Sequence, residues 1–303
     1  MSDSTAPPLT HKNFTYASSD HNLFQTFLIR TVETFTGQLK IWKLYKDYTQ
    51  EDPDTRDNFW NAAVKKLDLN VKYDERALAA IPQADPLVVV ANHPYGVLDG
   101  LIITQLMKRV RNDFKVLTNS VLCLAPEAKE DLLPVDFAQT EEALKTNLET
   151  RRSAREILKS GGCIVVFPAG GVSTIPTWKD KIAQDTAWQP FIARLIQESH
   201  ADVVPLFFHG QNSRLFQFAS LLSPTLRLAL FFKEVADKIG SNIEVRIGTK
   251  IPFEALSHLK DRDALCDELR SRTYALGGMT SLPPARQAYR IDTQTKNKVK
   301  SNH

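Results

Sequence analysis

Short, continuous runs of β-branched and aromatic residues constrain the fold of this chain more than any other feature. Residues 87–91 (LVVVA) and 163–167 (CIVVF) contain no charged or hydroxyl side chain. Such runs are typical of strands that are buried on both faces of a sheet. Each run ends at a polar turn, and segments with helical periodicity separate the runs. This alternation predicts an α/β fold with a mostly parallel, twisted sheet flanked by helices.

The alternation continues across residues 71–282, which we interpret as one domain. Thr140 is expected to cap a charged helix that ends at Gly161 and Gly162, because Thr suits a helix N-terminus and Gly a helix C-terminus. The predicted strands are residues 87–91, 114–117, 133–137, 163–167, 203–208 and 243–247, and the other helices of this region are predicted at residues 97–110, 190–199, 226–239 and 261–275.

The two ends of the chain differ from this domain. Residues 1–19 are polar and are expected to form a flexible leader, and residues 20–70 an N-terminal helical segment. Apolar residues recur at intervals of three and four across residues 23–45, and a second helix is predicted at residues 53–67. The first, amphipathic helix either packs on its own domain or lies in the membrane interface as an anchor. Residues 283–303 form a polar basic tail that is expected to be solvated, with attraction to a membrane as the lesser alternative.

Composition excludes several classes of protein. The net charge of +3, from 38 Lys and Arg against 35 Asp and Glu, is too small to indicate a nucleic-acid partner. The three cysteines form no metal-binding motif, so we expect no metal site and a reducing compartment. The longest uncharged window, residues 160–178, contains four Gly and two Pro and therefore predicts no membrane span. No secretory signal is recognisable at the N-terminus, and we expect a cytoplasmic protein.

The first candidate site segment is residues 91–100 (ANHPYGVLDG), where a predicted strand meets a helix. Sites in open α/β sheets form at the carboxyl ends of strands. His93 has the chemistry of a general base, and Asp99 could fix its tautomer and stabilise the imidazolium. Pro94 and Gly96 would form the turn between them. The alternative interpretation is a polar turn without a catalytic role.

Two later segments also join a strand to a polar turn. In residues 163–174, Gly170 and Gly171 allow a ligand to approach the backbone, and Ser173 could donate a hydrogen bond. The phosphate-loop pattern and the surroundings of a nucleophilic serine are absent, so a plain turn is the alternative. In residues 203–213, His209 and Asn212 are either site residues or hydrogen-bonded turn residues.

Taken in order, NHPYGVLDG, FPAGGVS and VPLFFHGQNS resemble the glycerolipid acyltransferase superfamily of the lysophosphatidate type, and most of all its lyso-ornithine-lipid and hemolysin-like branch. The resemblance spans residues 85–250. It implies that no cofactor is bound, that an acyl carrier protein or coenzyme A thioester is the co-substrate, and that a lysolipid at a membrane surface is the acceptor. The site residues it implies are the catalytic His93 and Asp99, with Asn92, Pro94, Gly96, Phe167, Pro168, Gly170, Gly171, Ser173 and Asn212 binding substrate.

The chain departs from the superfamily pattern in two blocks. Five residues separate His93 from Asp99, where four are usual. The usual FPEGTRS block reads FPAGGVS, so Val172 stands where the resemblance implies an Arg that grips the acceptor's phosphate. We therefore favour an acceptor with an amino-acid head group, of the lyso-ornithine type. Alternatively, another base replaces that Arg in a lysophosphatidate acyltransferase, and the candidates are Arg151, Arg152, Lys179 and Arg214.

The resemblance implies direct acyl transfer, in which His93 takes the acceptor's hydroxyl proton and N–H groups near Gly96 or Gly170 receive the oxyanion. Two other functions stay open: a serine hydrolase that uses Ser173 with His93 or His209, and a lipid-binding protein without catalysis. The peripheral protein is expected to reach the bilayer through its N-terminal helix. The candidates for an apolar groove around the acyl chain are Phe207, Phe208, Phe216, Phe218, Leu221 and Leu222.

Overall fold

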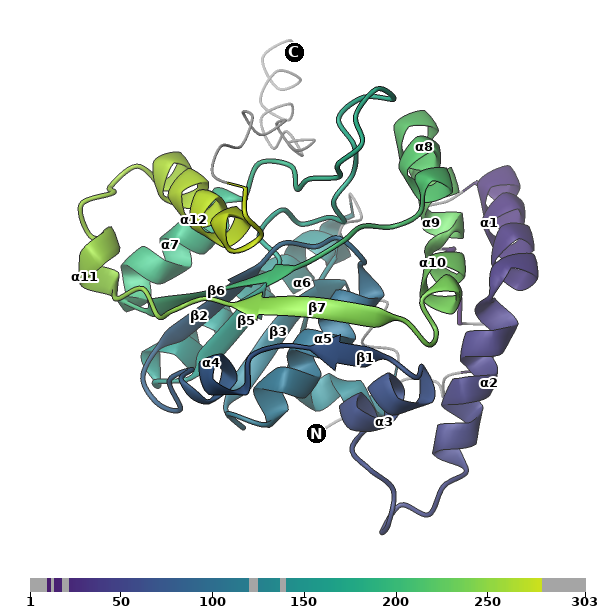
Figure 1. The fold of residues 1–303 in the computed structure, drawn as a ribbon, viewed down its shortest axis with the longest axis horizontal. Coiled ribbons are helices and arrows are strands. Elements are labelled where there is room, and N and C mark those ends of the chain that lie inside the picture. The colour runs from purple at the N-terminus through teal and green to yellow at the C-terminus, as the bar shows by residue number, and fades with distance from the viewer. Residues whose placement is uncertain (1–9, 12–13, 18–21, 120–124, 137–139, 280–303) are drawn as a thin grey trace, which may run out of the picture.

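A single sheet organises the molecule. The computed structural model describes residues 10–11, 14–17, 22–119, 125–136 and 140–279. Seven strands lie in the order β1-β7-β6-β2-β5-β3-β4, and all neighbours pair in parallel except the antiparallel β6 and β7 (Figure 1). The strands are β1 (Asn70–Lys72), β2 (Leu87–Ala91), β3 (Phe114–Asn119), β4 (Leu132–Val135), β5 (Cys163–Val166), β6 (Asp202–Phe208) and β7 (Asn242–Ile247). The predicted α/β fold with a mostly parallel sheet is confirmed.

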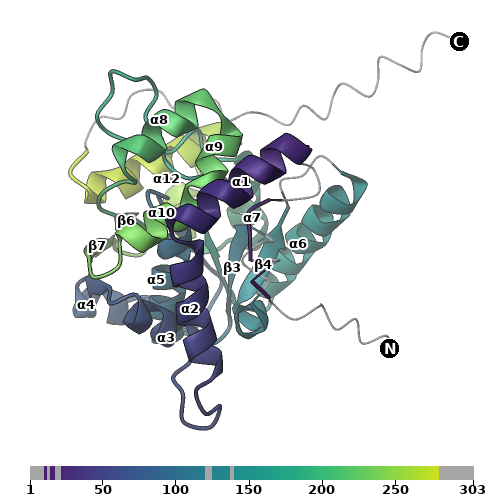
Figure 2. The ribbon, with the colours of Figure 1, turned by 90° about the vertical axis from the view of Figure 1, so that its right-hand side faces the viewer.

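Helices cover both faces of the sheet, as Figures 1 and 2 show from two directions. One face carries α3 and α5, with α2 and α10 beside them, and the other carries α6, α7 and α12. The helices are α1 (Leu23–Thr36), α2 (Gln38–Thr49), α3 (Phe59–Lys66), α4 (Glu75–Ala79), α5 (Val97–Lys108), α6 (Glu141–Lys159), α7 (Pro190–Ser199), α8 (Arg214–Leu222), α9 (Pro224–Ala229), α10 (Phe231–Asp237), α11 (Phe253–Leu256) and α12 (Arg262–Leu276), with a short 3-10 helix, η2 (Pro126–Asp131).

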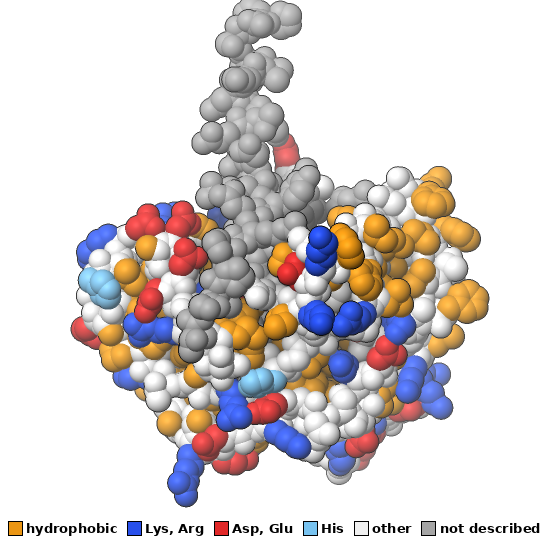
Figure 3. Space-filling view, turned by 45° about the horizontal axis from the view of Figure 1, so that its top comes forward, with side chains coloured by type: hydrophobic (Ala, Val, Ile, Leu, Met, Phe, Trp, Pro, Cys, Tyr) orange, Lys and Arg blue, Asp and Glu red, His pale blue; other side chains and the backbone are white. Residues whose placement is uncertain are grey.

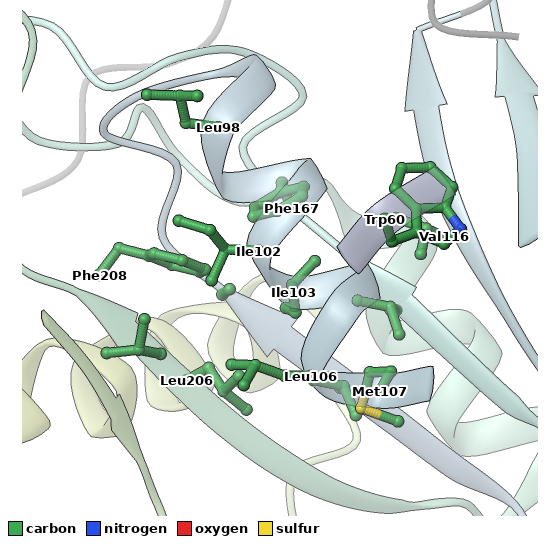
Figure 4. Packing of buried hydrophobic residues seen from close by; sticks show 14 of the residues in the cluster. Trp60, Leu98, Ile102, Ile103, Leu106, Met107, Val116, Phe167, Leu206 and Phe208 are labelled. Carbon is green, nitrogen blue, oxygen red and sulfur yellow. The ribbon is translucent and has the colours of Figure 1, made fainter. Parts of the chain in front are cut away.

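The central strands divide their side chains between two hydrophobic cores. In β2, Val89 belongs to the core under α5, whereas Val88 and Val90 belong to the core under α6 and α7. This division follows from the alternation of side chains along a strand. All five residues of β2 are buried, which explains why the strand reads as a continuous apolar run. Figure 4 shows the first core, in which Ile102 and Leu106 of α5 pack against the sheet.

The N-terminal helical segment differs from the prediction. The apolar stripe of residues 23–45 is divided into α1 and α2 at Gly37, where φ is +139°. A Cβ at Gly37 would lie 2.8 Å from the Cβ of Ala236, so the close approach of α10 requires glycine there. The helix predicted at residues 53–67 begins only at Phe59, because Asn58 supplies the N-terminal cap.

Elsewhere the boundaries agree with the structure to within a few residues. The side chain of Thr140 accepts a hydrogen bond from the Ala143 N–H and caps α6 as predicted. The helix predicted at residues 226–239 is two helices, α9 and α10, and the strand predicted at residues 133–137 is β4, one residue earlier, while residue 137 lies outside the described residues. The prediction missed α4, α8, α11 and β1.

Part of the expected flexible leader packs on the domain. The Thr15 hydroxyl donates a hydrogen bond of 2.5 Å to Oε2 of the buried Glu33, and the ring of Phe14 lies against Phe232. Residues 1–9, 12–13 and 18–19 of the leader and the basic tail at 283–303 lie outside the described residues. Among the residues that are described, no helix is long and apolar enough to cross a bilayer.

Candidate active site

The structure brings His93 and Asp99 together at the carboxyl end of β2. His93 follows the strand, and Asp99 lies in the first turn of α5. Nδ1 of His93 is 3.0 Å from Oδ2 of Asp99. The five intervening residues fit because Gly96 turns the chain with a φ of +74°, a conformation that favours glycine. The unusual spacing is therefore compatible with a paired His and Asp.

The Asp99 carboxylate is completely buried and holds the turn as well as the histidine. Its Oδ2 accepts hydrogen bonds from the N–H groups of Tyr95 (2.8 Å) and Gly96 (2.9 Å). Burial raises the pKa of Asp99, while the contact with His93 and the two N–H groups lower it. With Nδ1 facing this carboxylate, Nε2 is the imidazole nitrogen left to accept a proton.

The imidazole of His93 stacks on one aromatic ring and stays partly exposed. Its ring stacks on the ring of Phe167 with the centroids 4.1 Å apart, and the side chain is 17% exposed. The main chain of His93 is fixed at both ends: its N–H donates to Oδ1 of Asp185 (3.2 Å), and its carbonyl accepts from the Ser173 N–H (2.8 Å). His93 is thus oriented by four separate contacts while part of its side chain stays exposed.

Two residues predicted to bind substrate make side-chain hydrogen bonds within the protein. The Asn92 amide donates to the carbonyl of Phe208 (2.9 Å) and accepts from the Phe208 N–H (2.7 Å), so it joins the ends of β2 and β6. The Ser173 hydroxyl is 1% exposed and donates to Oδ1 of Asp185 (2.5 Å). Because Ser173 faces a carboxylate rather than a histidine, the geometry opposes a serine hydrolase.

The N–H groups expected to receive an oxyanion are already engaged. That of Gly96 donates to Asp99, and that of Gly170 donates to the carbonyl of Phe167 within its turn (3.0 Å). Gly170 and Gly171 are exposed, and within the described part of the chain the N–H groups of Gly171 and Val172 have no hydrogen-bond acceptor. Near Gly170, as predicted, the glycine turn can therefore still offer the N–H groups of Gly171 and Val172 as donors.

The remaining predicted residues differ in accessibility. Pro94 is buried in the turn after His93, and Pro168 is buried with its carbonyl accepting from the Gln189 N–H (2.9 Å). Asn212 is 2% exposed, and neither end of its amide has a partner among the described residues. A buried amide without partners is costly, so Asn212 keeps its capacity to bind a polar group.

Val172 lies in an apolar environment, and three of the four proposed replacement bases have other partners. It packs in a small cluster around Phe216 and Leu230, beside Gly96. Arg152 pairs with Glu156 (2.9 Å). Arg151 lies over the ring of Phe191, and Lys179 lies over the ring of Trp178. Arg214 is exposed at the start of α8.

An apolar cavity of about 160 Å³ lies along one face of α5, and its location differs from the predicted groove. It is lined by α2, α3, β3 and residues 14–16, and by the face of α5 that includes Val97, Gly100 and Leu101. Of the groove residues proposed from the sequence, Phe207, Phe208 and Phe216 are buried in the cores, whereas Phe218, Leu221 and Leu222 are exposed on α8. The cavity starts at the first turns of the helix that carries Asp99.

Sequence reasoning missed the residues behind the histidine. Asp185 is fully buried and also accepts from Nε1 of Trp188 (3.0 Å). The Tyr274 hydroxyl accepts from the Asp185 N–H (2.7 Å), and Nη2 of Arg270 donates to the Asp185 carbonyl (3.1 Å). In the sequence Asp185 stands between Gln184 and Thr186, and an acidic residue in such a polar stretch by itself indicates no site.

A protein-family model described as acyltransferase matches residues 42–276. The chain belongs to the acyltransferase family.

Two relatives of this acyltransferase are named lyso-glycine lipid O-acyltransferase. The one from Phocaeicola vulgatus is 25% identical over 215 residues, 67% of this chain and 72% of the relative. The one from Bacteroides thetaiotaomicron is 23% identical over 232 residues, 72% of this chain and 79% of the relative. Among solved structures, the 1-acyl-sn-glycerophosphate acyltransferase from Thermotoga maritima matches the acyltransferase with a TM-score of 0.45 and 14% identity, over 86% of this chain and 97% of that one.

Proposed function

We propose that the protein transfers a fatty acyl group from an acyl carrier protein or coenzyme A thioester to the hydroxyl of a lysolipid with an amino-acid head group. The observation that carries the proposal is the His93–Asp99 pair at the carboxyl end of β2. An apolar cavity along α5, the helix that carries Asp99, supports it. A base at a strand end and a compartment for a hydrocarbon chain are the two parts that acyl transfer to a lipid requires.

The chemistry needs no acyl-enzyme. Nε2 of His93 takes the hydroxyl proton as the oxygen attacks the thioester carbonyl, and Asp99 stabilises the imidazolium. The N–H groups of Gly171 and Val172 are the candidate donors to the tetrahedral oxyanion. When the intermediate collapses, the C–S bond breaks, the leaving thiolate takes the proton from His93, and the ester is released.

The apolar setting of Val172 supports an acceptor without a phosphomonoester. Val172 can neither donate a hydrogen bond nor carry a charge, and its neighbours in the cluster are apolar. Two relatives carry names that specify a glycine-headed lysolipid, which is also an amino-acid lipid. An ornithine-type head group belongs to the same class, because an amino acid acylated on its amine keeps a carboxylate in place of a phosphate.

We also propose that the protein binds peripherally to the cytoplasmic face of the membrane through α1 and α8. Large apolar side chains are exposed on both helices, and Figures 1 and 2 place the two helices on the same side of the molecule, with α9 packed against both. Figure 3 shows hydrophobic side chains gathered on that side. Lys40 and Lys43 are exposed on α2 and suit lipid phosphates. The exposed apolar residues are Leu23, Phe24, Phe27 and Phe35 of α1 with Leu215, Phe218, Leu221 and Leu222 of α8.

The test of the function is acyl transfer by purified protein and by His93→Ala. Acyl carrier protein and coenzyme A thioesters are offered against lyso-glycine lipid, lyso-ornithine lipid and lysophosphatidate. We expect product from the amino-acid lysolipids and a loss of about 10²- to 10⁴-fold in His93→Ala at an unchanged melting temperature. Product from lysophosphatidate alone would contradict the head-group argument. Lysolipid binding without thioester consumption would favour a lipid-binding protein without catalysis.

Liposome flotation tests the membrane surface. Paired substitution of Phe24 and Phe27 by Ser on α1 is expected to weaken binding, and so is paired substitution of Phe218 and Leu222 on α8, because all four side chains are exposed and apolar. Ser substitution of the exposed Leu148 on α6 is the matched control. Full binding by both paired variants would contradict the anchoring proposal.

A further inference from the structure

Asp185 is a buried carboxylate beside the proposed base, and the reaction proposed for His93 and Asp99 gives it no role. It follows a loop that a bridge between Thr174 and Gln184 closes. Its Oδ1 accepts from the Ser173 hydroxyl (2.5 Å) and the His93 N–H (3.2 Å), and its Oδ2 from Trp188. The loop, the glycine turn and the histidine therefore meet at one carboxylate.

The partners of Asp185 favour its ionised form. All three groups that face its oxygens are donors, and an anionic carboxylate satisfies each of them. Burial raises the pKa of Asp185, while Ser173, Trp188 and the nearby His93 lower it. Within the described part of the chain, no Lys or Arg side chain pairs with this carboxylate, since Arg270 donates to its backbone carbonyl instead.

The contacts reach the imidazole in two ways. The hydrogen bond to the His93 N–H fixes the main chain that carries the ring, and Ser173 closes the other end by donating to the His93 carbonyl. Because the carboxylate is hydrogen-bonded to the His93 N–H, its negative charge also lies close to the residue that would become an imidazolium. The other charged or titratable groups that we find packed here are Asp99 from α5 and, behind Asp185, Arg270 and Tyr274 from α12.

We propose that Asp185 is a positioning residue for His93, which holds the main chain of the base and places a second negative charge beside the imidazolium that forms during transfer. The inference rests on the proposed function, in which His93 is the general base. It also accounts for the burial of Ser173, whose hydroxyl donates to the carboxylate and orients it.

Asp185→Asn keeps the shape of the side chain and removes its charge. We expect kcat to fall about 10²-fold with little change in KM for the acceptor. The reason is that a general base displaced by about 1 Å is no longer aligned with the hydroxyl proton that it removes. The pH midpoint of the His93 imidazole signal in NMR should move to lower pH, since the imidazolium loses a neighbouring negative charge. A residue that only supports the fold would not move that midpoint.

Two matched variants separate charge from packing. Asp180→Asn removes an exposed carboxylate from the same loop and should change neither kcat nor the midpoint. Trp188→Phe removes one donor to Asp185 but keeps the charge, so the midpoint should not fall. If Asp185→Asn does not fold, Ser173→Ala tests the proposal in its place. This variant loses the hydrogen bond from Ser173 to the carboxylate, which should lower kcat about tenfold at an unchanged KM.

The inference is overturned if folded Asp185→Asn keeps the parental kcat and midpoint, or, where that variant does not fold, if Ser173→Ala keeps the parental kcat. Failure of the proposed function gives a different result: the unmodified protein would transfer no acyl group to any lysolipid. The His93 midpoint would still decide in that case whether Asp185 acts on the imidazole.

Discussion

Gly100 offers a direct test of whether the apolar cavity holds the acyl chain. It lies in α5, lines the cavity, and a Cβ at this position would meet no atom within 4 Å. A methyl group added here therefore meets no other atom, and a longer side chain would extend into the cavity that Gly100 lines. The substitution changes the space for a ligand and leaves His93 and Asp99 in place.

Two substitutions at Gly100 are expected to have different effects: Gly100→Ala raises stability, and Gly100→Leu lowers activity. Gly100→Ala removes a helix-interior glycine and is expected to stabilise the fold by about 0.8–1 kcal/mol, which corresponds to about 2–4 °C in melting temperature. Gly100→Leu adds three carbons beyond Cβ and should displace about three methylenes of a long acyl chain. At about 0.8 kcal/mol per buried methylene, the loss is about 2.4 kcal/mol, or about 60-fold in kcat/KM.

The assay measures kcat/KM for a series of thioesters that differ in chain length by two carbons. For Gly100→Leu we expect the loss to be large for the longest donors and to disappear for donors short enough to leave the cavity partly empty. Gly100→Ala is the matched control for the helix and should change the preference by one step at most. An unchanged preference in folded Gly100→Leu would refute the assignment of the cavity to the acyl chain.

Three further predictions concern other parts of the molecule. Arg111→Lys should destabilise the protein by about 3–5 kcal/mol in chemical denaturation, because the buried guanidinium donates to Asp113 and to the carbonyls of Pro82, Asp85 and Gly161; a change below about 1 kcal/mol would contradict this. Burial raises the pKa of Cys163 and Cys266 to about 12, so native protein at neutral pH should resist alkylation at both, as read by mass spectrometry, and react only when unfolded. Burial also raises the pKa of Asp99 above its ordinary 3.8, so the folded protein binds the proton more tightly and loses stability as the pH rises above that value. Asp99→Asn should flatten this fall in melting temperature with pH while transfer activity drops, and an unchanged slope would argue against the assignment.

Most of the strands were predictable from the sequence because their signal is local. A strand buried on both faces needs an unbroken apolar segment, and Leu87–Ala91 supplies one without help from the rest of the chain. The caps at Thr140 and Asp261 are local as well, since each side chain bonds to an N–H three residues later. The break at Gly37 was not predictable, because its cause is the approach of Ala236 from α10.

The candidate site also has a part that the sequence predicts and a part that only the fold shows. His93 and Asp99 lie on either side of one turn, so their pairing needs only that turn and the start of a helix. The engagement of Asn92 with Phe208, and of Ser173 with Asp185, depends on which segments meet at the strand ends. A polar residue in a turn has the same sequence signal whether it faces a substrate or a buried partner.

The sequence by itself determined the α/β class, the positions of most strands and the placement of the His93–Asp99 turn, because each depends on neighbours within a few residues. Only the tertiary structure decided that the cavity lies between α2, α3 and α5 rather than around β6 and α8. It also decided that Asp185 stands behind the histidine. Both results depend on contacts between residues far apart in the chain, where burial and hydrogen bonding are set by packing rather than by local pattern.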